Sequence, residues 1–364
     1  MKRLSACTLA LCAALSHQLQ AQRSELLLEK GWRFTRQDQA SFSTPDYNDS
    51  KWSRVTVPHD WAIYGPFSFE NDKQHLAIAQ DGQKEAMEHA GRTGGLPFVG
   101  AGWYRRSLDI PQDLGDRRVF LRFDGAMSHA RVYVNGKEVG YWPYGYNTFA
   151  FDVTPYVRPG ASNTLAVRLE NKHESSRWYP GAGLYRNVHL TITPPTYIPL
   201  WGTRIQTPSV SADQAYVSVE TKVAVLSHLA GRPLRIETKI LSPEGKVVAE
   251  RSESFSSKGT DSIYRTGFDI SAPKLWDINQ PNLYKYAVTL SDGSRIIDRD
   301  TTTFGIRSIE LKAGEGFFLN GRKLKFQGAC LHHDLGPLGA AVNEAAMRRQ
   351  IRQMQDMGVN AIRT

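Results

Sequence analysis

The sequence predicts a mostly β protein in which two successive β-sandwiches are followed by a strand, a helix and a strand. Short apolar or alternating runs, separated by Gly, Pro and Asn, fill residues 23–307, as expected for antiparallel sheets. Apolar residues at helical spacing occur clearly only near the carboxyl terminus. The strand, helix, strand order found there predicts a parallel pair of strands joined by a crossover helix.

Residues 1–21 have the pattern of a secretory signal peptide. Two basic residues precede an apolar core from Leu9 to Leu15, and a polar stretch ends at Ala21, where we expect cleavage. The sequence therefore predicts an exported protein, either periplasmic or secreted. No other run is long and apolar enough to span a membrane, so no membrane partner is expected.

Composition limits the classes of partner and of cross-link. Cys7 and Cys12 leave with the signal segment, so the mature chain keeps only Cys330 and forms no internal disulfide. We expect Cys330 to be a small buried apolar residue on a strand. The formal net charge of +9 comes from scattered Lys and Arg without a basic block or a zinc spacing. Nucleic acid is therefore not expected as a partner.

Residues 22–195 predict a sandwich of the jelly-roll type. The clearest element is a hairpin over 131–139, with an Asn135-Gly136 turn. A stiff Thr-Pro-Pro-Thr break ends the module at residues 193–196. Further strands are expected at 119–123, 150–153, 164–169 and 187–192.

Residues 196–307 predict an immunoglobulin-like sandwich without the disulfide. Apolar and polar residues alternate strictly over 217–225 and 234–240, which indicates half-buried strands. Turns are expected at Glu244-Gly245 and Asp292-Gly293. The length of about 110 residues suits this fold.

Residues 308–364 predict the first βαβ unit of a (β/α)8 barrel. Two runs, 317–320 and 323–331, meet at an Asn-Gly turn, and a helix is expected to begin at Asn343. A second strand is expected at 359–363. Such a barrel takes about 250 residues, so we interpret this stretch as its opening only. The apolar residues at helical spacing are Met347, Ile351, Met354 and Met357, with Gly358 as the expected cap.

Polar residues follow both strands of this unit. His332, His333 and Asp334 come after the first strand, and Arg363 ends the second. The carboxyl ends of parallel strands are where barrel enzymes hold their chemistry. Adjacent residues on one loop seldom supply convergent metal ligands, so no metal site is predicted from His333 and Asp334.

Several short stretches, taken in order, resemble glycoside hydrolase family 2, which includes β-galactosidases, β-glucuronidases and β-mannosidases. The resemblance covers nearly the whole chain after residue 21. The stretches that carry it are Val57-Pro58-His59-Asp60-Trp61, Gly102-Trp103-Tyr104-Arg105-Arg106, Phe123-Asp124-Gly125, Val134-Asn135-Gly136, Trp178-Tyr179-Pro180-Gly181-Ala182-Gly183-Leu184-Tyr185-Arg186-Asn187-Val188, Phe304-Gly305-Ile306-Arg307, Leu319-Asn320-Gly321, Gly328 with His332, and Gly358-Val359-Asn360-Ala361-Ile362-Arg363-Thr364.

The resemblance implies a retaining exo-β-glycosidase acting on oligo- or polysaccharides, with a galactose-binding-like jelly roll at its amino terminus. Its two catalytic glutamates are expected beyond Thr364, so this stretch alone is expected to be inactive. The residue pattern Gly-Ala-Cys-Leu-His-His-Asp-Leu-Gly at 328–336 favours a β-galactosidase, with β-glucuronidase as the second candidate. If the natural chain ends here, a non-catalytic carbohydrate-binding protein is the remaining interpretation.

The resemblance also implies roles for individual residues. His332 is expected to hydrogen-bond a sugar hydroxyl, with the alternative that it ties down its own loop. Asp334 is interpreted as a sugar-binding acceptor or a support for one. Arg363 is expected to orient the nucleophilic carboxylate, with a structural ion pair as the alternative.

Aromatic loops of the first module add two further candidates, Arg177 and Trp178. Sugars stack their C–H faces on aromatic rings, although aromatic residues also pack in sandwich cores.

No cofactor is predicted from this stretch. The resemblance allows a Mg or Na ion and a homo-oligomer in the complete enzyme, but Ser176-Arg177 replaces an aspartate that contacts sugar and cation in some relatives.

Overall fold

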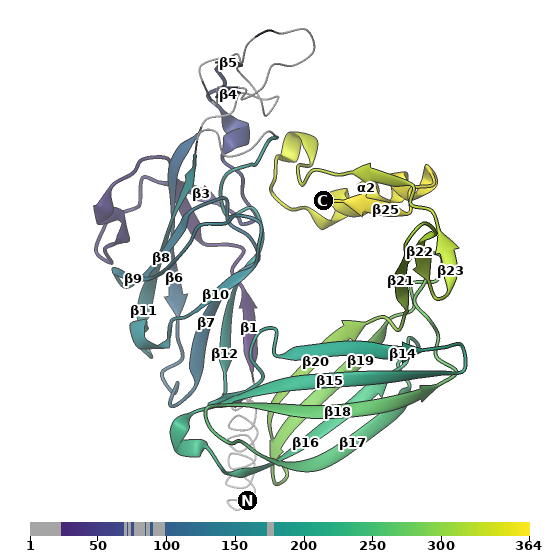
Figure 1. Cartoon of the computed structure of the whole chain (residues 1–364). Helices are drawn as coiled ribbons and strands as arrows, with labels where there is room; N and C mark the ends of the chain where they lie inside the picture. The colour runs from purple at the N-terminus through teal and green to yellow at the C-terminus, as the bar shows by residue number, and fades with distance from the viewer. Residues whose placement is uncertain are drawn as a thin grey trace, which may run out of the picture. The chain divides into compact units, whose positions relative to one another are not determined.

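The computed structural model describes residues 23–68, 71, 74–75, 84, 88–89, 99–172 and 178–364. They form two compact units (Figure 1). Unit A comprises residues 25–191 and 327–364, and unit B comprises residues 192–326 with the residues up to Ser24. The expected signal peptide and Arg177 lie outside the described residues.

Unit A contains the first sandwich, built from a four-stranded sheet of order β1-β12-β7-β10 and a six-stranded sheet of order β3-β2-β6-β11-β8-β9. A short antiparallel pair, β4-β5, stands apart from both sheets. The strands are β1 (Ser24–Leu27), β2 (Trp32–Thr35), β3 (Ser53–Val55), β4 (Gln74–His75), β5 (Glu88–His89), β6 (Gly100–Asp109), β7 (Arg118–Phe123), β8 (Ala130–Val134), β9 (Lys137–Trp142), β10 (Phe149–Asp152), β11 (Ser162–Asn171) and β12 (Val188–Thr193). Single 3-10 turns are η1 (Ala40–Ser43), η2 (Ala62–Tyr64) and η3 (Thr154–Tyr156).

Period-two alternation places the core of unit A between its two sheets. Strand β7 alternates between half-buried and buried residues, and Leu121 and Phe123 are fully enclosed. Large aromatic side chains are fully buried as well, among them Trp32, Trp61, Trp103 and Tyr104. The predicted strands of this module are confirmed, and so is the hairpin turn, where Asn135 and Gly136 both adopt positive φ.

Unit B contains the second sandwich, whose long strands lie in two layers (Figure 1). One sheet has the order β13-β15-β14 with β18 also paired to β15, and the other has the order β17-β16-β19-β20. Alternating apolar residues from both sheets form one core, which includes Val219, Ile236 and Tyr286. The elements are β13 (Thr196–Tyr197), β14 (Thr203–Val210), β15 (Gln214–Val225), η4 (Ser227–Leu229), β16 (Pro233–Leu241), β17 (Val247–Ser256), β18 (Asp261–Ser271), β19 (Tyr284–Asp292) and β20 (Arg295–Phe304).

The predicted strand at 323–331 is divided in two in the structure. Strands β21 (Ile309–Lys312), β22 (Gly316–Leu319) and β23 (Arg322–Leu324) form a small antiparallel sheet in unit B. Strand β24 (Gly328–Cys330) belongs to unit A and pairs with a different partner. The run was predicted as one strand because it is rich in apolar residues, but the chain passes between units at Phe326.

The predicted strand, helix, strand unit is confirmed. Strand β24 pairs in parallel with β25 (Ala361–Arg363), and α2 (Glu344–Asp356) connects them after the 3-10 turn η5 (Gly336–Leu338). Asn343 caps the helix by accepting a hydrogen bond from the Ala346 amide. None of the helix residues is buried, and its apolar residues Met347 and Ile351 are about two-fifths exposed.

The expectation of a buried Cys330 is wrong, because its side chain is exposed. Among the described residues, β24 and β25 form a two-stranded sheet. Within the described residues no second layer covers this face of β24, so an apolar residue there stays in contact with solvent.

Candidate functional site

A buried carboxylate, Asp60, joins three segments of unit A. Its Oδ1 atom accepts hydrogen bonds from the backbone amides of Ala62 (2.9 Å) and Ala182 (3.0 Å). Its Oδ2 atom accepts from the Tyr179 hydroxyl (2.6 Å) and from the Ala340 amide (2.8 Å). Burial raises the pKa of Asp60, while the hydrogen bond from Tyr179 and the three amides act to lower it. Asp60 therefore holds the loop of 332–340 against the sandwich.

Two glycines permit this close approach. A Cβ atom on Gly181 would lie 2.3 Å from the Cβ of Ala340, and one on Gly339 would lie 2.4 Å from Oδ2 of Asp60. Both residues also adopt positive φ, at 69° and 62°. No other residue type fits at these two positions without moving the loop.

His333 forms a second anchor for the same loop. Its Nε2 atom lies 2.8 Å from the carbonyl oxygen of Pro180, so Nε2–H donates to that carbonyl. The imidazole meets the rings of Tyr146 and Tyr185 edge to face, with centroids 5.2 and 5.7 Å away. Burial lowers the pKa of His333, which favours the neutral ring in this position.

His332 is exposed and lies beside aromatic side chains of the sandwich. Its ring meets Trp178 edge to face at 5.8 Å, and Trp178 is 39% exposed. The indole N–H of Trp178 donates to the Tyr146 hydroxyl (2.9 Å), whose ring lies 5.4 Å from that of Tyr144. We name these four residues, Tyr144, Tyr146, Trp178 and His332, the aromatic rim. It offers ring faces and hydrogen-bonding groups together, the combination that suits a sugar.

The remaining predicted site residues differ in their burial and in their contacts. Asp334 is half-buried and forms no hydrogen bond or ion pair with any described residue. Arg363 is exposed and stands opposite Cys330 at the carboxyl end of the β24-β25 pair. Arg177 lies outside the described residues. The structure thus brings His332 and Trp178 into contact and leaves Asp334 and Arg363 available for other partners.

Sequence reasoning did not identify Asp60, Tyr179 or His333 as the residues that fix the loop. The first two stand in stretches that carried the family resemblance, at 57–61 and 178–188, yet nothing in those stretches indicated their roles. Asp60 and Ala340 are 280 residues apart in the chain, so their contact is invisible without the fold. The exposed His332 and the anchored His333 are adjacent and equally polar in the sequence.

The described part of the chain contains no cluster of three or more His, Cys, Asp or Glu that would hold a metal ion. Among the same residues, no helix has the length and apolar character needed to cross a membrane.

Comparison with known proteins identifies the family. The model for glycosyl hydrolases family 2, sugar binding domain, matches residues 27–194. The model for glycosyl hydrolases family 2 matches residues 200–307. The chain belongs to glycosyl hydrolase family 2. The two matched regions correspond to the first sandwich and to the long strands of unit B.

Several family 2 proteins align with almost the whole chain. The β-galactosidase BoGH2A of Bacteroides ovatus is 36% identical over 353 residues, which are 96% of this chain and 39% of the relative. The β-glucuronidase of Bacteroides fragilis is 32% identical, over 96% of this chain and 47% of the relative. A crystal structure of a family 2 member from Bacteroides cellulosilyticus superposes with a TM-score of 0.84 at 32% identity, covering 93% of this chain and 42% of that one. The chain therefore spans less than half the length of these family 2 relatives.

Proposed function

We propose that the complete protein is a retaining exo-β-glycosidase that removes terminal β-linked galactose from oligo- or polysaccharides. The main support is the loop of 332–340, which is anchored by His333 and Asp60 and leaves His332 exposed beside Trp178. Family 2 relatives named as β-galactosidases add to this support. Other relatives are named as β-glucuronidases, so β-glucuronidase activity is the alternative.

In this proposal the described residues bind and orient the sugar. His332 and Asp334 exchange hydrogen bonds with sugar hydroxyls, since a neutral imidazole both donates and accepts and a carboxylate accepts. Trp178 packs against a C–H face of this sugar or of the adjacent sugar unit. Arg363 orients the nucleophilic carboxylate through its planar guanidinium.

The chemistry itself requires two glutamates, which we place beyond Thr364. One attacks the anomeric carbon while the other protonates the leaving oxygen, and water then hydrolyses the glycosyl-enzyme. This double displacement requires the two carboxyl groups to be about 5 Å apart. We further propose that residues 1–21 direct export and are removed, which the amino-terminal residue of the secreted protein would test.

The test uses a longer form of the protein that includes the region following Thr364. We expect it to hydrolyse a nitrophenyl β-galactoside with retention, and to act less well on the corresponding β-glucuronide. In this form His332→Ala should lower kcat/KM by about tenfold, which corresponds to about 1.4 kcal/mol of transition-state binding. His228→Ala, an exposed histidine of unit B, is the matched control.

Four outcomes would contradict the proposal. Preferential hydrolysis of the glucuronide would reassign the substrate. An unchanged kcat/KM for His332→Ala would return this residue to a structural role. Binding of a galactose analogue without turnover by the longer form would favour a non-catalytic carbohydrate-binding protein, and turnover by residues 1–364 alone would show that the glutamates are misplaced here.

A further inference from the structure

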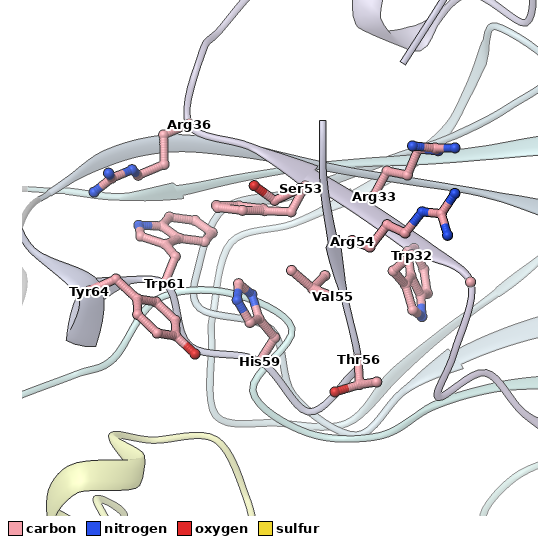
Figure 2. Close-up of a pocket in the computed structure, with 12 residues that line it drawn as sticks. Trp32, Arg33, Arg36, Ser53, Arg54, Val55, Thr56, His59, Trp61 and Tyr64 are labelled. Carbon is pink, nitrogen blue, oxygen red and sulfur yellow. The ribbon is translucent and has the colours of Figure 1, made fainter. Parts of the chain in front are cut away.

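A concave surface of unit A, apart from the aromatic rim, lies along β2 and the edge strand β3. It is a cleft of about 860 Å³, and Figure 2 shows the side chains around it. None of the residues that form it belongs to the aromatic rim. The described residues that line the cleft include Arg33, Arg36, Arg54, His59, Trp61 and Tyr64.

The cleft is positively charged. Arg33 and Arg54 are directly opposite each other in the β2-β3 register, and Arg36 is a third cation in the lining. No carboxylate occurs among the described lining residues. Arg33 is paired with Asp49 (3.2 Å), but Arg54 forms no ion pair or hydrogen bond with any described residue. Like charges directly opposite on neighbouring strands are unfavourable, so an anion between them would stabilise this arrangement.

The same cleft presents aromatic and hydrogen-bonding surface. The ring of Tyr64 is 70% exposed and stacks on the ring of His59 at 6.0 Å. Trp61 is buried, and its indole N–H has no acceptor within the described residues. The hydroxyl groups of Ser53 and Thr56 complete the polar lining. Such a mixture of ring face and donors suits a carbohydrate.

The charged and aromatic groups occupy different parts of the cleft. In Figure 2 the guanidinium groups of Arg33 and Arg54 lie together at one end. Tyr64, with Trp61 and Arg36, lies at the other end. A ligand that engages both ends therefore needs a ring and an anionic group on separate units of a chain.

We propose that this cleft binds an anionic oligosaccharide. A carboxylate or sulfate group lies between Arg33 and Arg54, and a neighbouring sugar ring packs on Tyr64. This binding goes beyond the glycosidase proposal and is measured without turnover, so the two proposals fail separately.

The experiment titrates the 364-residue chain, by isothermal calorimetry, with four probes of similar length. These are tetragalacturonate, a sulfated carrageenan tetrasaccharide, neutral β-1,4-galactotetraose and an oligothymidylate. We expect one or both anionic glycans to bind about tenfold or more tightly than the neutral one. The comparison between the first two probes shows whether carboxylate or sulfate is the preferred group.

Two variants assign the binding to the cleft. Arg54→Gln should weaken binding of the preferred glycan by about fivefold or more, and Tyr64→Ala should weaken it to a similar extent. The matched controls are Arg299→Gln, another exposed strand arginine that forms no ion pair among the described residues, and Tyr216→Ala, which is 40% exposed on β15. Both controls should bind as the unchanged chain does, and all four substituted side chains are exposed enough to leave the fold intact.

Several results would overturn the proposal. Equal weakening by Arg54→Gln and Arg299→Gln would mean attraction to the net charge rather than to the cleft. The proposal of an anionic oligosaccharide would be wrong if neutral galactotetraose bound as tightly as the better-bound anionic glycan, or if neither anionic glycan bound. Tighter binding of oligothymidylate than of both glycans would point to a single-stranded nucleic acid instead.

Discussion

The Tyr179 hydroxyl donates a hydrogen bond of 2.6 Å to the Oδ2 atom of Asp60, 119 residues earlier in the chain. This oxygen also accepts from the Ala340 amide, so one carboxylate atom connects the segment of 178–183 to the loop that carries His332. Burial and the nearby negative charge of Asp60 raise the pKa of Tyr179. The phenol therefore keeps its proton and remains a donor throughout the pH range in which the carboxylate is charged.

Removing this donor should destabilise unit A. We expect Tyr179→Phe to lower its free energy of unfolding by about 2 kcal/mol, because a hydrogen bond to a charged and buried acceptor is lost. Urea unfolding followed by tryptophan fluorescence measures this change. Tyr144→Phe is the control, since Tyr144 is 53% exposed and its hydroxyl forms no hydrogen bond with the described residues. Equal stability of the two variants would show that the Tyr179 hydroxyl contributes nothing.

Asp60→Asn should lower the free energy of unfolding more than Tyr179→Phe does. The amide keeps one acceptor oxygen, but its NH₂ group would face two of the four donors that the carboxylate now accepts. We expect the free energy of unfolding to fall by about 3 kcal/mol, because donors are left unpaired in a buried site. Asp46→Asn, at an exposed aspartate without described partners, should change the same unfolding curve by less than about 0.5 kcal/mol. A loss as small as that of Asp46→Asn would contradict this role for Asp60.

Several strands and turns of both sandwiches could be predicted because their signals are local. Alternation over 217–225 follows from one buried face of β15, and the Asn135-Gly136 turn follows from the positive φ that both residues adopt. The same holds for α2, whose cap Asn343 is adjacent to the helix that it begins. Each of these features depends on residues that are neighbours in the chain.

The anchoring of the site could not be predicted because it depends on distant partners. The donors to Asp60 include residues 2, 119, 122 and 280 positions away, and three of the four are backbone amides that carry no side-chain signal. Burial of Cys330 was expected from its residue type and its strand, whereas exposure depends on whether another layer covers that strand. The resemblance pointed to the stretches that contain Asp60 and Tyr179, but it did not indicate which atoms form the hydrogen bonds.

The adjacent histidines should respond differently to substitution. His333→Ala removes the hydrogen bond to Pro180 and the packing on two tyrosines, so we expect unit A to lose about 2 kcal/mol. His332→Ala should change stability by less than about 0.5 kcal/mol, because its ring is exposed and meets only the edge of Trp178. Urea unfolding of both variants provides the measurement, each serving as the control for the other. The reverse order of stabilities would make His332 the anchor of the loop.

His59 should make unit A sensitive to acid. Its largely buried ring lies 2.7 Å from the Tyr104 hydroxyl through Nδ1, and burial lowers the pKa of His59 to about 4 from an ordinary value of 6.5. Between these two values the unfolded chain binds a proton that the folded chain does not, so stability falls as the pH decreases from 6.5 towards 4.

The size of this effect can be isolated by substitution. From pH 7.5 to pH 4.5 the unchanged chain should lose about 2 kcal/mol of unfolding free energy through His59 alone, in addition to losses from other groups. In His59→Gln this share of the loss should be absent, because glutamine does not titrate, whereas the control His332→Gln keeps His59 and should still show it. Urea unfolding of the three proteins at both pH values tests the difference. If His59→Gln were as acid-sensitive as the unchanged chain, protonation of His59 would not oppose folding, and its ring would have to accept a proton in the folded cleft.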